Sequence, residues 1–336
     1  MKIILATPFF HQNRGNTVTT KRIAHGLHLL GIDNETISIT QPLISLPQGD
    51  LYHGFNAYRF YQFFKNHKER IHQYVVTLTG TDLNHDLYDP IRRHEVIECL
   101  SRAEAIHVFH HSAKKDLVIE IPHVEDKIHV IPQSADIFQI DKVNRYKKSS
   151  EFIFLLPAGI RKIKNIPEAI SMLEKVHHTH PNMKLWLVGP VLEEDEEKIV
   201  QKLVHDNNWI HYFGEFPHEK MGELYKEADV VLNTSLTEGQ PAALLEAMGM
   251  GKPVIASSNQ GNESIIKSNW NGLIYHDQQQ FIGHCEKLIQ DSSLRETLGS
   301  VAKAYIEEHH SLEDEAKAFL EVYQKVLKQP CGGEKK

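Results

Sequence analysis

Short apolar runs alternate with amphipathic and polar stretches along nearly the whole chain. In one of these stretches, Ile23, Leu27 and Leu30 fall on one helical face, which predicts a helix over residues 20–30. Gly31 follows directly and is expected to end that helix. Apolar and β-branched runs around and beyond it are typical of strands. In the first half of the chain we expect strands at residues 2–6, 35–39, 74–78, 105–109 and 127–131.

The same rhythm restarts after a polar stretch near the middle of the chain. Residues 141–150 (DKVNRYKKSS) are mostly charged or polar, which is typical of a linker between domains. Strands and helices then alternate again, and a long amphipathic helix closes the pattern before a tail that we expect to be disordered. The expected strands are 152–156, 184–188, 209–212, 229–233 and 253–256, the expected helices are 167–177, 197–207, 242–248 and 312–328, and the tail is 329–336.

These segments predict an α/β protein with two doubly wound, Rossmann-like domains, residues 1–140 and 151–311. Strands that are separated by helices imply a parallel sheet covered on both faces. Ligands of such sheets bind outside the carboxyl ends of the strands. We therefore expect the domains to face each other across a cleft, with the last helix packing back across it. The dinucleotide fingerprint G-x-G-x-x-G is absent, which disfavours a hydride-transfer enzyme.

Composition and charge narrow the possible functions. The 336 residues carry a formal net charge of −7, so no nucleic-acid partner held by a basic surface is expected. No apolar run approaches ~18 residues, so we expect no integral membrane segment. A signal peptide is the alternative at residues 1–10, but polar residues follow at once and favour a buried strand. The 3 cysteines lie far apart, which indicates a reducing, cytoplasmic location, and the 23 histidines lack metal-ligand spacing, so no metal site is expected.

The strongest candidate for chemistry is the segment 237–247 (TEGQPAALLEA), which follows a predicted strand and opens a predicted helix. Pro suits a first helical turn and Gly lets the backbone approach a ligand closely, while free amides and the helix dipole favour a diphosphate. Glu246 lies about 7–8 Å beyond the first turn along the helix axis. This matches the separation between the diphosphate and the ribose of a nucleotide. The alternative is that one glutamate favours the helix dipole and the other is merely exposed. The predicted donor-binding residues here are Gly239, Gln240, Pro241, Ala242 and Glu246, and Glu238 is a candidate catalytic residue.

A second candidate is the loop 159–165 (GIRKIKN), between a predicted strand and a predicted helix. Asn165 and Glu168 predict a capping box at the start of that helix. Arg161 and Lys164 would then stand at the edge of the sheet, where two cations suit a departing nucleoside diphosphate. A solvated basic loop is the alternative. Gly159 is assigned to donor binding, and the two cations are candidate catalytic residues.

The N-terminal half contributes two loops that follow predicted strands. One contains Gly15 and Asn16, which we assign to donor binding, and the other contains Thr81 and Asp82, which we assign to the acceptor or the sugar. Both loops are expected at the carboxyl ends of their strands, where ligands bind. The alternative is turn chemistry, since Gly, Asn, Asp and Thr are the residues that turns require.

These motifs together resemble the family-4 retaining glycosyltransferases of the GT-B fold. The pair Glu238 and Glu246 resembles their E-x7-E motif, and Gly159, Arg161 and Lys164 resemble their glycine-arginine-lysine loop, with a shorter Arg-to-Lys spacing. Residues 128–132 with Asp136 resemble their interdomain segment, although Gln133-Ser134 replaces the usual Asn-Gly. Residues 15–19 and 78–84 are similar to a subgroup that contains the selenosugar synthase of selenoneine biosynthesis and the glycosyltransferase 1 domain-containing proteins.

The resemblance implies transfer of a sugar from a UDP-sugar donor with retained anomeric configuration and without a cofactor or metal. Arg161 and Lys164 would neutralise the leaving diphosphate, Glu238 would bind hydroxyls of the donor sugar, and Glu246 would bind the ribose. Asp82 stands near the position where many relatives carry a histidine that contacts the sugar. The acceptor and the oligomeric state stay open. A GT-B sugar-nucleotide epimerase and a non-catalytic sugar-nucleotide-binding protein are the alternatives.

Overall fold

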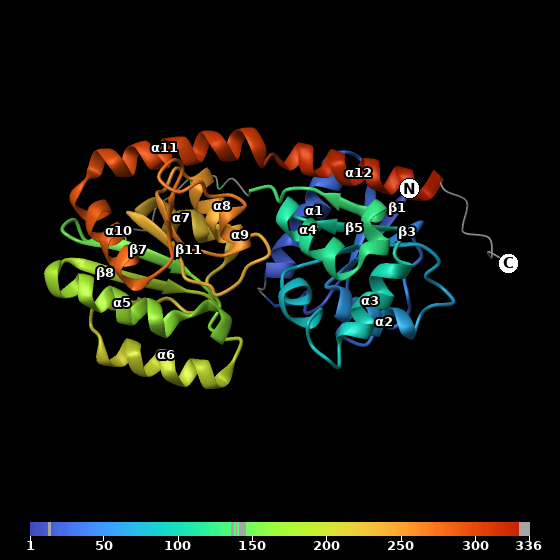
Figure 1. Cartoon of the computed structure of the whole chain (residues 1–336), viewed down its shortest axis with the longest axis horizontal. Helices are drawn as coiled ribbons and strands as arrows, with labels where there is room; N and C mark the ends of the chain where they lie inside the picture. The colour runs from blue at the N-terminus through green and yellow to red at the C-terminus, as the bar shows by residue number, and fades with distance from the viewer. Residues whose placement is uncertain (13–14, 136–137, 139, 141–145, 329–336) are drawn as a thin grey trace. The chain divides into compact units, whose positions relative to one another are not determined.

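The computed structural model describes residues 1–12, 15–135, 138, 140 and 146–328 (Figure 1). Asp136, the first half of the expected linker and the expected tail 329–336 lie outside the described residues. The chain forms two compact units. The N-terminal unit comprises residues 1–134, the short segment 238–242 and the chain from His310 onward, and the C-terminal unit comprises residues 135–237 and 243–309. Each unit is built on its own sheet.

The N-terminal unit contains a six-stranded sheet in the order β2-β1-β3-β4-β5-β6, in which all neighbouring strands are parallel. The five predicted strands of this half are confirmed, and β3 was missed. That strand has the sequence LYHGF and is buried throughout. Its central His and Gly hide the β-branched pattern on which strand prediction depends. The strands are β1 (Lys2–Thr7), β2 (Asp33–Ser38), β3 (Leu51–Phe55), β4 (Tyr74–Thr77), β5 (Ala105–Val108) and β6 (Ile128–Val130).

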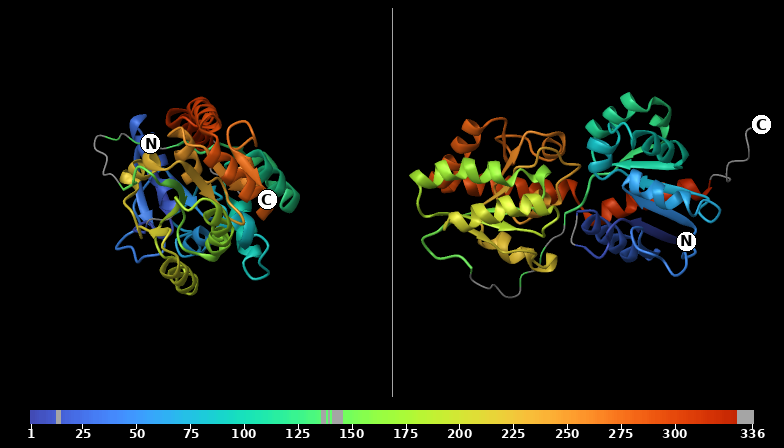
Figure 2. Two further views of the ribbon diagram at one scale, coloured as in Figure 1. Left: turned by 90° about the vertical axis from the view of Figure 1, so that its left-hand side faces the viewer. Right: turned by 90° about the horizontal axis from the view of Figure 1, so that it is seen from below.

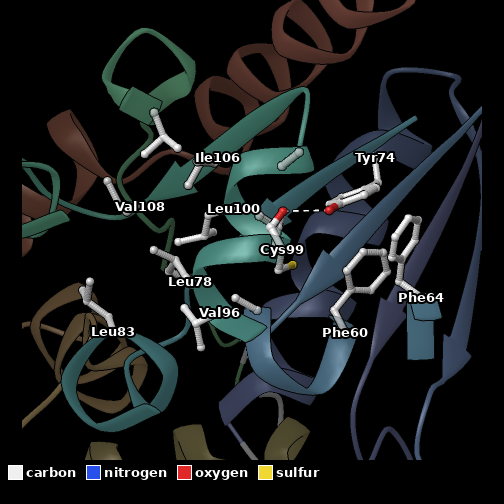
Figure 3. Close-up of a cluster of buried hydrophobic side chains, with 14 of the residues drawn as sticks. Phe60, Phe64, Tyr74, Leu78, Leu83, Val96, Cys99, Leu100, Ile106 and Val108 are labelled. Atoms are coloured by element: carbon white, nitrogen blue, oxygen red, sulfur yellow. Dashed lines mark hydrogen bonds between the residues drawn. The ribbon is translucent and has the colours of Figure 1, made fainter. Parts of the chain in front are cut away.

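Helices cover both faces of this sheet because most of its strands are buried on both sides. In β1, Ile4 and Ala6 pack into one core cluster, and Ile3 and Leu5 into another. Figure 3 shows part of the first cluster, where the hydroxyl of Tyr74 donates a 2.7 Å hydrogen bond to the carbonyl of Cys99. The second cluster contains residues of α1 and α12, which pack side by side (Figure 2). The helices are α1 (Gly15–Leu29), α2 (Ala57–Lys65), α3 (Arg93–Arg102), α4 (His111–Glu120) and α12 (Leu312–Lys328), with a π-helical turn at Asp82–Asp86 and a 3-10 turn at Pro122–Lys127.

Helix α1 begins five residues earlier than the predicted start at residue 20. The hydroxyl of Thr20 donates a 2.7 Å hydrogen bond to the carbonyl of Asn16, one turn back, and the hydroxyl of Thr17 donates to the carbonyl of Phe9 at 3.3 Å. Threonine can satisfy its hydroxyl against the backbone in this way and so be buried in a helix. Gly15 and Asn16 therefore lie in the first turn of α1 rather than in the predicted loop.

The C-terminal unit contains a second parallel six-stranded sheet, in the order β12-β11-β10-β7-β8-β9. Counted from β7, this is the 3-2-1-4-5-6 order of dinucleotide-binding Rossmann domains read from the other edge. The five predicted strands of this half are confirmed, and the short β12 was missed. The strands are β7 (Phe152–Pro157), β8 (Met183–Val188), β9 (Ile210–Tyr212), β10 (Val230–Asn233), β11 (Val254–Ser257) and β12 (Leu273–Tyr275).

Two core clusters again lie on opposite faces of this sheet. Phe154 and Leu156 of β7 pack with residues of α5, α6 and α10, whereas Ile153 and Leu155 pack with residues of α7, α8 and α11. Figure 1 shows α5 and α6 together on one side of the β7–β8 region. The helices are α5 (Ile166–Thr179), α6 (Glu194–Asp206), α7 (Met221–Glu227), α8 (Ala242–Gly249), α9 (Gln260–Glu263), α10 (Gln278–Gln290) and α11 (Ser292–His309), with 3-10 turns at Lys162–Lys164 and His218–Lys220.

The predicted capping box at the start of α5 is wrong. Asn165 adopts a left-handed conformation with φ 54° and ψ 39°, and its side chain makes no capping hydrogen bond. Its main-chain N–H instead bonds to the carbonyl of Lys162 at 3.1 Å and closes a 3-10 turn. Asparagine tolerates this conformation better than most residues. The chain therefore reverses at Asn165, and the cation-bearing loop is a tight turn.

Candidate functional site

The strand order of the C-terminal unit directs attention to the carboxyl ends of β7 and β10. Strand order reverses between these neighbours, and ligands of open parallel sheets bind at such a switch point. The loops that follow both strands are the two motif regions. They are joined by hydrogen bonds from the Thr234 hydroxyl to the Lys164 carbonyl and from the Leu236 N–H to the Ile163 carbonyl, each 2.9 Å long. The fold thus brings together two segments that lie about 70 residues apart in the sequence.

Gly159 and Arg161 occupy the first of these loops. A Cβ atom on Gly159 would lie 2.8 Å from a methyl carbon of Leu192, so a side chain at this position would force the neighbouring segment away. The Nε atom of Arg161 is buried and has no hydrogen-bond partner among the described residues. In the part of the chain that the structure describes, the only other buried side-chain polar atoms without a hydrogen-bond partner are Oγ1 of Thr7 and Oδ1 of Asn262. An unsatisfied buried donor on a cationic side chain is suited to an anionic oxygen of a ligand.

Glu246 lies on α8 and is only 5% exposed. The ring Nε2 of His218 lies 2.8 Å from Oε1, and the hydroxyl of Tyr225 donates a 2.8 Å hydrogen bond to Oε2. Burial, together with the adjacent Glu246 carboxylate, raises the pKa of Tyr225 well above its usual value, so its hydroxyl stays a donor. Glu246 is therefore neither exposed nor a mere dipole partner, which the alternative interpretation had suggested. His218 and Tyr225 were missed, because no local spacing ties them to α8.

The segment 238–242 belongs to the N-terminal unit, where hydrogen bonds between side chains and main-chain atoms hold it. His110 Nε2 lies 3.0 Å from the carbonyl oxygen of Gly239, and the N–H of Gln133 donates a 2.7 Å hydrogen bond to Oε1 of Gln240. Asn84 also donates to the carbonyl of Glu238 at 3.3 Å. Gly239 and Gln240 are thus buried, and Glu238 is half-buried. Pro241 is buried directly before α8, and Ala242 is the first residue of that helix.

A close approach of two glycines explains part of this arrangement. Gly80 has φ +101°, and a Cβ atom on it would lie 3.0 Å from the main-chain nitrogen of Gly239. A Cβ atom on Gly239 would in turn lie 3.3 Å from the Cα of Gly80. Only glycine combines this backbone conformation with so little space. The sequence contained no signal that Gly80 and Gly239 are partners.

His110 is the N-cap residue of α4. It is buried, and its Nδ1 accepts a 3.1 Å hydrogen bond from the N–H of Ala113 at the start of α4. Because Nδ1 accepts, the neutral ring carries its proton on Nε2, and that nitrogen donates to the Gly239 carbonyl. Burial is the largest cause that lowers the pKa of His110, which favours this neutral form.

Asp82, which the sequence analysis assigned to the acceptor or the sugar, has main-chain partners instead of an open position. Its side chain is fully buried, with Oδ2 accepting from the N–H of Ala57 at 2.8 Å and Oδ1 from the N–H groups of Thr79 at 2.7 Å and Leu83 at 3.2 Å. Burial raises its pKa to about 6, although the hydrogen bonds oppose that shift. Asp82 therefore joins the start of α2 to the turn after β4. Its neighbour Thr81 is exposed.

Gly15 and Asn16 follow β1, which pairs with β3 where the strand order of the N-terminal sheet reverses. Gly15 is exposed, and apart from its chain neighbours no atom of the described residues lies within 4 Å of the position that a Cβ would occupy. Asn16 is half-buried. Both residues thus lie at the switch point of their own sheet, where a helix begins. The first amides of a helix are suited to anions.

Across the residues with assigned positions, no group of three or more His, Cys, Asp or Glu side chains is arranged to hold a metal ion. None of the helices in the described ranges combines the length and apolar character that a membrane crossing requires.

The architecture defines the class of protein. Two Rossmann-like units, each with a parallel six-stranded sheet, form the GT-B fold of glycosyltransferases. The chain belongs to the family described as glycosyl transferases group 1, whose sequence profile matches residues 137–305. It therefore is a glycosyltransferase by family.

Individual relatives agree with this assignment. Glycosyltransferase 1 domain-containing protein 1 of Xenopus tropicalis is 28% identical over 250 residues, which cover 71% of this chain and 72% of that protein. The structure of HepE from Anabaena in complex with UDP and glucose matches with a TM-score of 0.77 and 18% identity, over 97% of this chain and 100% of that chain. The sucrose-phosphate synthase of Thermosynechococcus elongatus matches with a TM-score of 0.80 and 16% identity, over 97% and 99% of the two chains.

Proposed function

We propose that this protein is a retaining glycosyltransferase that transfers a sugar from a UDP-sugar to an acceptor, without a metal ion. The observation that carries the proposal is the Arg161 loop at the switch point of the C-terminal sheet, with a buried cationic donor that the described residues leave unsatisfied. The nucleotide in the HepE complex supports a UDP-linked donor, since that protein shares the fold. The resemblance to family-4 enzymes supports retention of configuration.

In the proposed reaction the bond from the anomeric carbon to the diphosphate breaks as the acceptor oxygen attacks, and UDP leaves with the bonding electrons. The transition state separates a positively charged sugar ring from an increasingly negative diphosphate. Arg161 and Lys164 stabilise that leaving group, together with main-chain amides in the first turn of α8. Glu238 binds hydroxyls of the donor sugar, and Glu246 binds the ribose. Gly15 and Asn16 contribute the amides at the start of α1 to the donor phosphates.

The structure changes the part that Asp82 plays in this proposal. A carboxylate with both oxygens bound to main-chain amides shapes the turn after β4 and is not itself offered to the sugar. Thr81, which is exposed beside it, remains the candidate for contact with sugar or acceptor.

The test is incubation of the purified protein with UDP-sugars, alone and with a panel of small-molecule acceptors, followed by chromatography of the nucleotides and sugars. A transferase releases UDP in proportion to a glycoside product, whose anomeric configuration is read by NMR. A UDP-sugar epimer without release of UDP would instead establish the epimerase. Binding of UDP-sugars with neither product would establish a sugar-nucleotide-binding protein.

A further inference from the structure

The carboxylate of Glu246 is held from two sides by side chains of different elements. His218, in the 3-10 turn before α7, contacts Oε1, and Tyr225, on α7 itself, contacts Oε2. Both contacts are 2.8 Å long, and all three residues belong to the C-terminal unit. A buried carboxylate requires such partners, because its charge is costly to remove from water.

The two contacts have a defined direction. Tyr225 is fully buried and remains protonated, so its hydroxyl donates to Glu246, and the carbonyl of Ala243 lies within 3.3 Å of the same hydroxyl. The carboxylate can only accept, so Nε2 of His218 donates as well. In the described contacts, each oxygen of Glu246 thus receives one hydrogen bond. A carboxylate oxygen can accept two, which is the capacity that a ribose hydroxyl would use.

Aromatic packing fixes the rings behind these contacts. The ring of Phe138 meets His218 edge-on at 5.5 Å between centroids and lies 5.8 Å from the ring of Tyr225. Gly222 makes room for it, because a Cβ atom there would lie 2.5 Å from the Cβ of Phe138. The donors are thus held by neighbours that do not contact Glu246 in any described hydrogen bond.

We propose that His218 and Tyr225 are positioning residues, which hold the Glu246 carboxylate in the orientation that accepts the ribose hydroxyls of the donor nucleotide. This inference rests on the proposed function, since it takes Glu246 as the ribose ligand. An unheld glutamate loses considerable side-chain entropy when it binds a ligand. A glutamate that the fold has already ordered avoids that loss, so each ribose hydroxyl contributes more to affinity.

The experiment measures how strongly the protein distinguishes UDP from 2′-deoxy-UDP and 3′-deoxy-UDP by isothermal titration calorimetry. The proteins are the wild type, His218→Phe, Tyr225→Phe and His218→Gln. In the wild type we expect at least one deoxy nucleotide to bind about tenfold or more weakly than UDP, as befits a hydrogen bond to a charged group. In His218→Phe and Tyr225→Phe this ratio should fall to about threefold or less. His218→Gln keeps an N–H donor and should retain most of the wild-type ratio.

The ratio separates positioning from a general effect on the fold, since a merely destabilised protein binds all three nucleotides equally less well. An unchanged ratio in both Phe variants overturns the inference. A wild type that binds UDP without distinguishing the deoxy nucleotides also overturns it and removes the ribose contact of Glu246, but leaves the proposed sugar transfer standing. A wild type that binds none of the three nucleotides overturns both. Melting temperatures report folding, and Tyr225→Phe, which removes a single oxygen, decides the outcome if His218→Phe does not fold.

Discussion

Asp82 in the N-terminal unit and Glu246 in the C-terminal unit are both buried carboxylates. The sequence suggested Asp82 as a ligand of the acceptor or the sugar, and Glu246 as a ligand of the donor. Their surroundings differ in kind. Asp82 accepts its shortest hydrogen bonds from three main-chain N–H groups, with the Thr79 hydroxyl further away at 3.4 Å, whereas Glu246 accepts from two side chains in the described contacts. Main-chain donors belong to the fold and are lost only if the turn is rebuilt. The comparison teaches that burial alone does not mark a ligand group, and that the source of its partners indicates its role.

The groups near each carboxylate strengthen this contrast. Asp82 connects the first residue of α2 to the turn after β4, so its contacts hold elements of the sheet edge together. Glu246 follows the β10 loop, which is bonded to the turn that carries Arg161 and Lys164. The contrast supports a structural role for Asp82 and the proposed ribose contact for Glu246.

The largest expected effect is on kcat, and it tests whether Arg161 and Lys164 of the C-terminal unit stabilise the leaving group. Arg161→Ala and Lys164→Ala should each lower kcat by roughly 10²-fold or more, if each cation supplies ~3 kcal/mol to the leaving group. KM for the donor will rise somewhat, because the same cations bind the ground-state diphosphate. Steady-state kinetics measure both constants. Lys162→Ala is the matched control, since Lys162 is an exposed cation of the same turn. A near-wild-type kcat in both Ala variants would show that the loop is solvated surface.

The next effect tests the structural role of Asp82. Asp82→Ala leaves buried N–H groups at the start of α2 and in the turn after β4 without an acceptor, and should lower the free energy of unfolding by about 2–3 kcal/mol. Chemical denaturation measures this change. Thr81→Ala, next to it and exposed, should stay within about 0.5 kcal/mol. If Asp82→Ala has the stability of the wild type and yet loses turnover, Asp82 is a ligand group and its structural assignment is wrong.

Glu246→Ala should affect the donor KM more than kcat. A ribose contact is present equally in the ground state and the transition state, so its loss weakens binding by about tenfold and changes kcat less. Glu238→Ala should lie between this variant and Arg161→Ala, since the sugar ring that Glu238 binds changes shape in the transition state. Kinetics with varied donor concentration measure the split, and circular dichroism checks folding. A Glu246→Ala enzyme with an unchanged KM would remove Glu246 from the nucleotide site.

The dependence of the free energy of unfolding on pH gives a further test of the role of Asp82. The raised pKa of Asp82, about 6, adds stability below about pH 4 that is lost as the pH rises to 6. Burial lowers the pKa of His107 to about 4, so its contribution is present above about pH 6.5 and is lost as the pH falls to 4. Between about pH 4 and 6, Asp82 thus makes the free energy of unfolding fall with rising pH, whereas His107 makes it rise. Removal of the first contribution by Asp82→Asn should steepen the loss of stability in acid by up to about 1.4 kcal/mol per pH unit.

Denaturant titrations between pH 4 and 7 measure that slope for both proteins. Asp89→Asn provides the control, because Asp89 is not buried and its pKa is lowered instead, by the N–H groups of Ile91 and Arg92. Identical slopes for the wild type and Asp82→Asn would mean that Asp82 does not hold a proton in the folded state.

The smallest expected effect is that of metal removal. Donor binding and turnover should survive excess chelator, because Arg161, Lys164 and helix amides supply the positive charge that a metal would otherwise provide. Activity is measured before and after chelation, with manganese or magnesium added back. A complete loss of activity in chelator that manganese or magnesium restores would contradict the hypothesis that protein cations alone neutralise the diphosphate.

The architecture was largely predictable, and the gaps have physical causes. Two parallel sheets followed from apolar runs that alternate with helical patterns, because a strand buried on both faces must be apolar throughout. Strand β3 escaped because His53 and Gly54 interrupt its pattern, although His53 is satisfied inside the core by Thr77 and Tyr323. Local propensity cannot register partners that lie far along the chain.

By itself the sequence determined the fold class, the two sheets and the segments that carry Arg161 and Glu246, since these depend on hydrophobic period and on short motifs. Only the tertiary structure decided how the individual polar groups are used. It satisfied Asp82 with main-chain amides, placed His218 and Tyr225 against Glu246, and brought Gly80 to Gly239. A polar side chain acts according to the partners that surround it, and those partners come from elements whose separation in sequence carries no information about their distance in space.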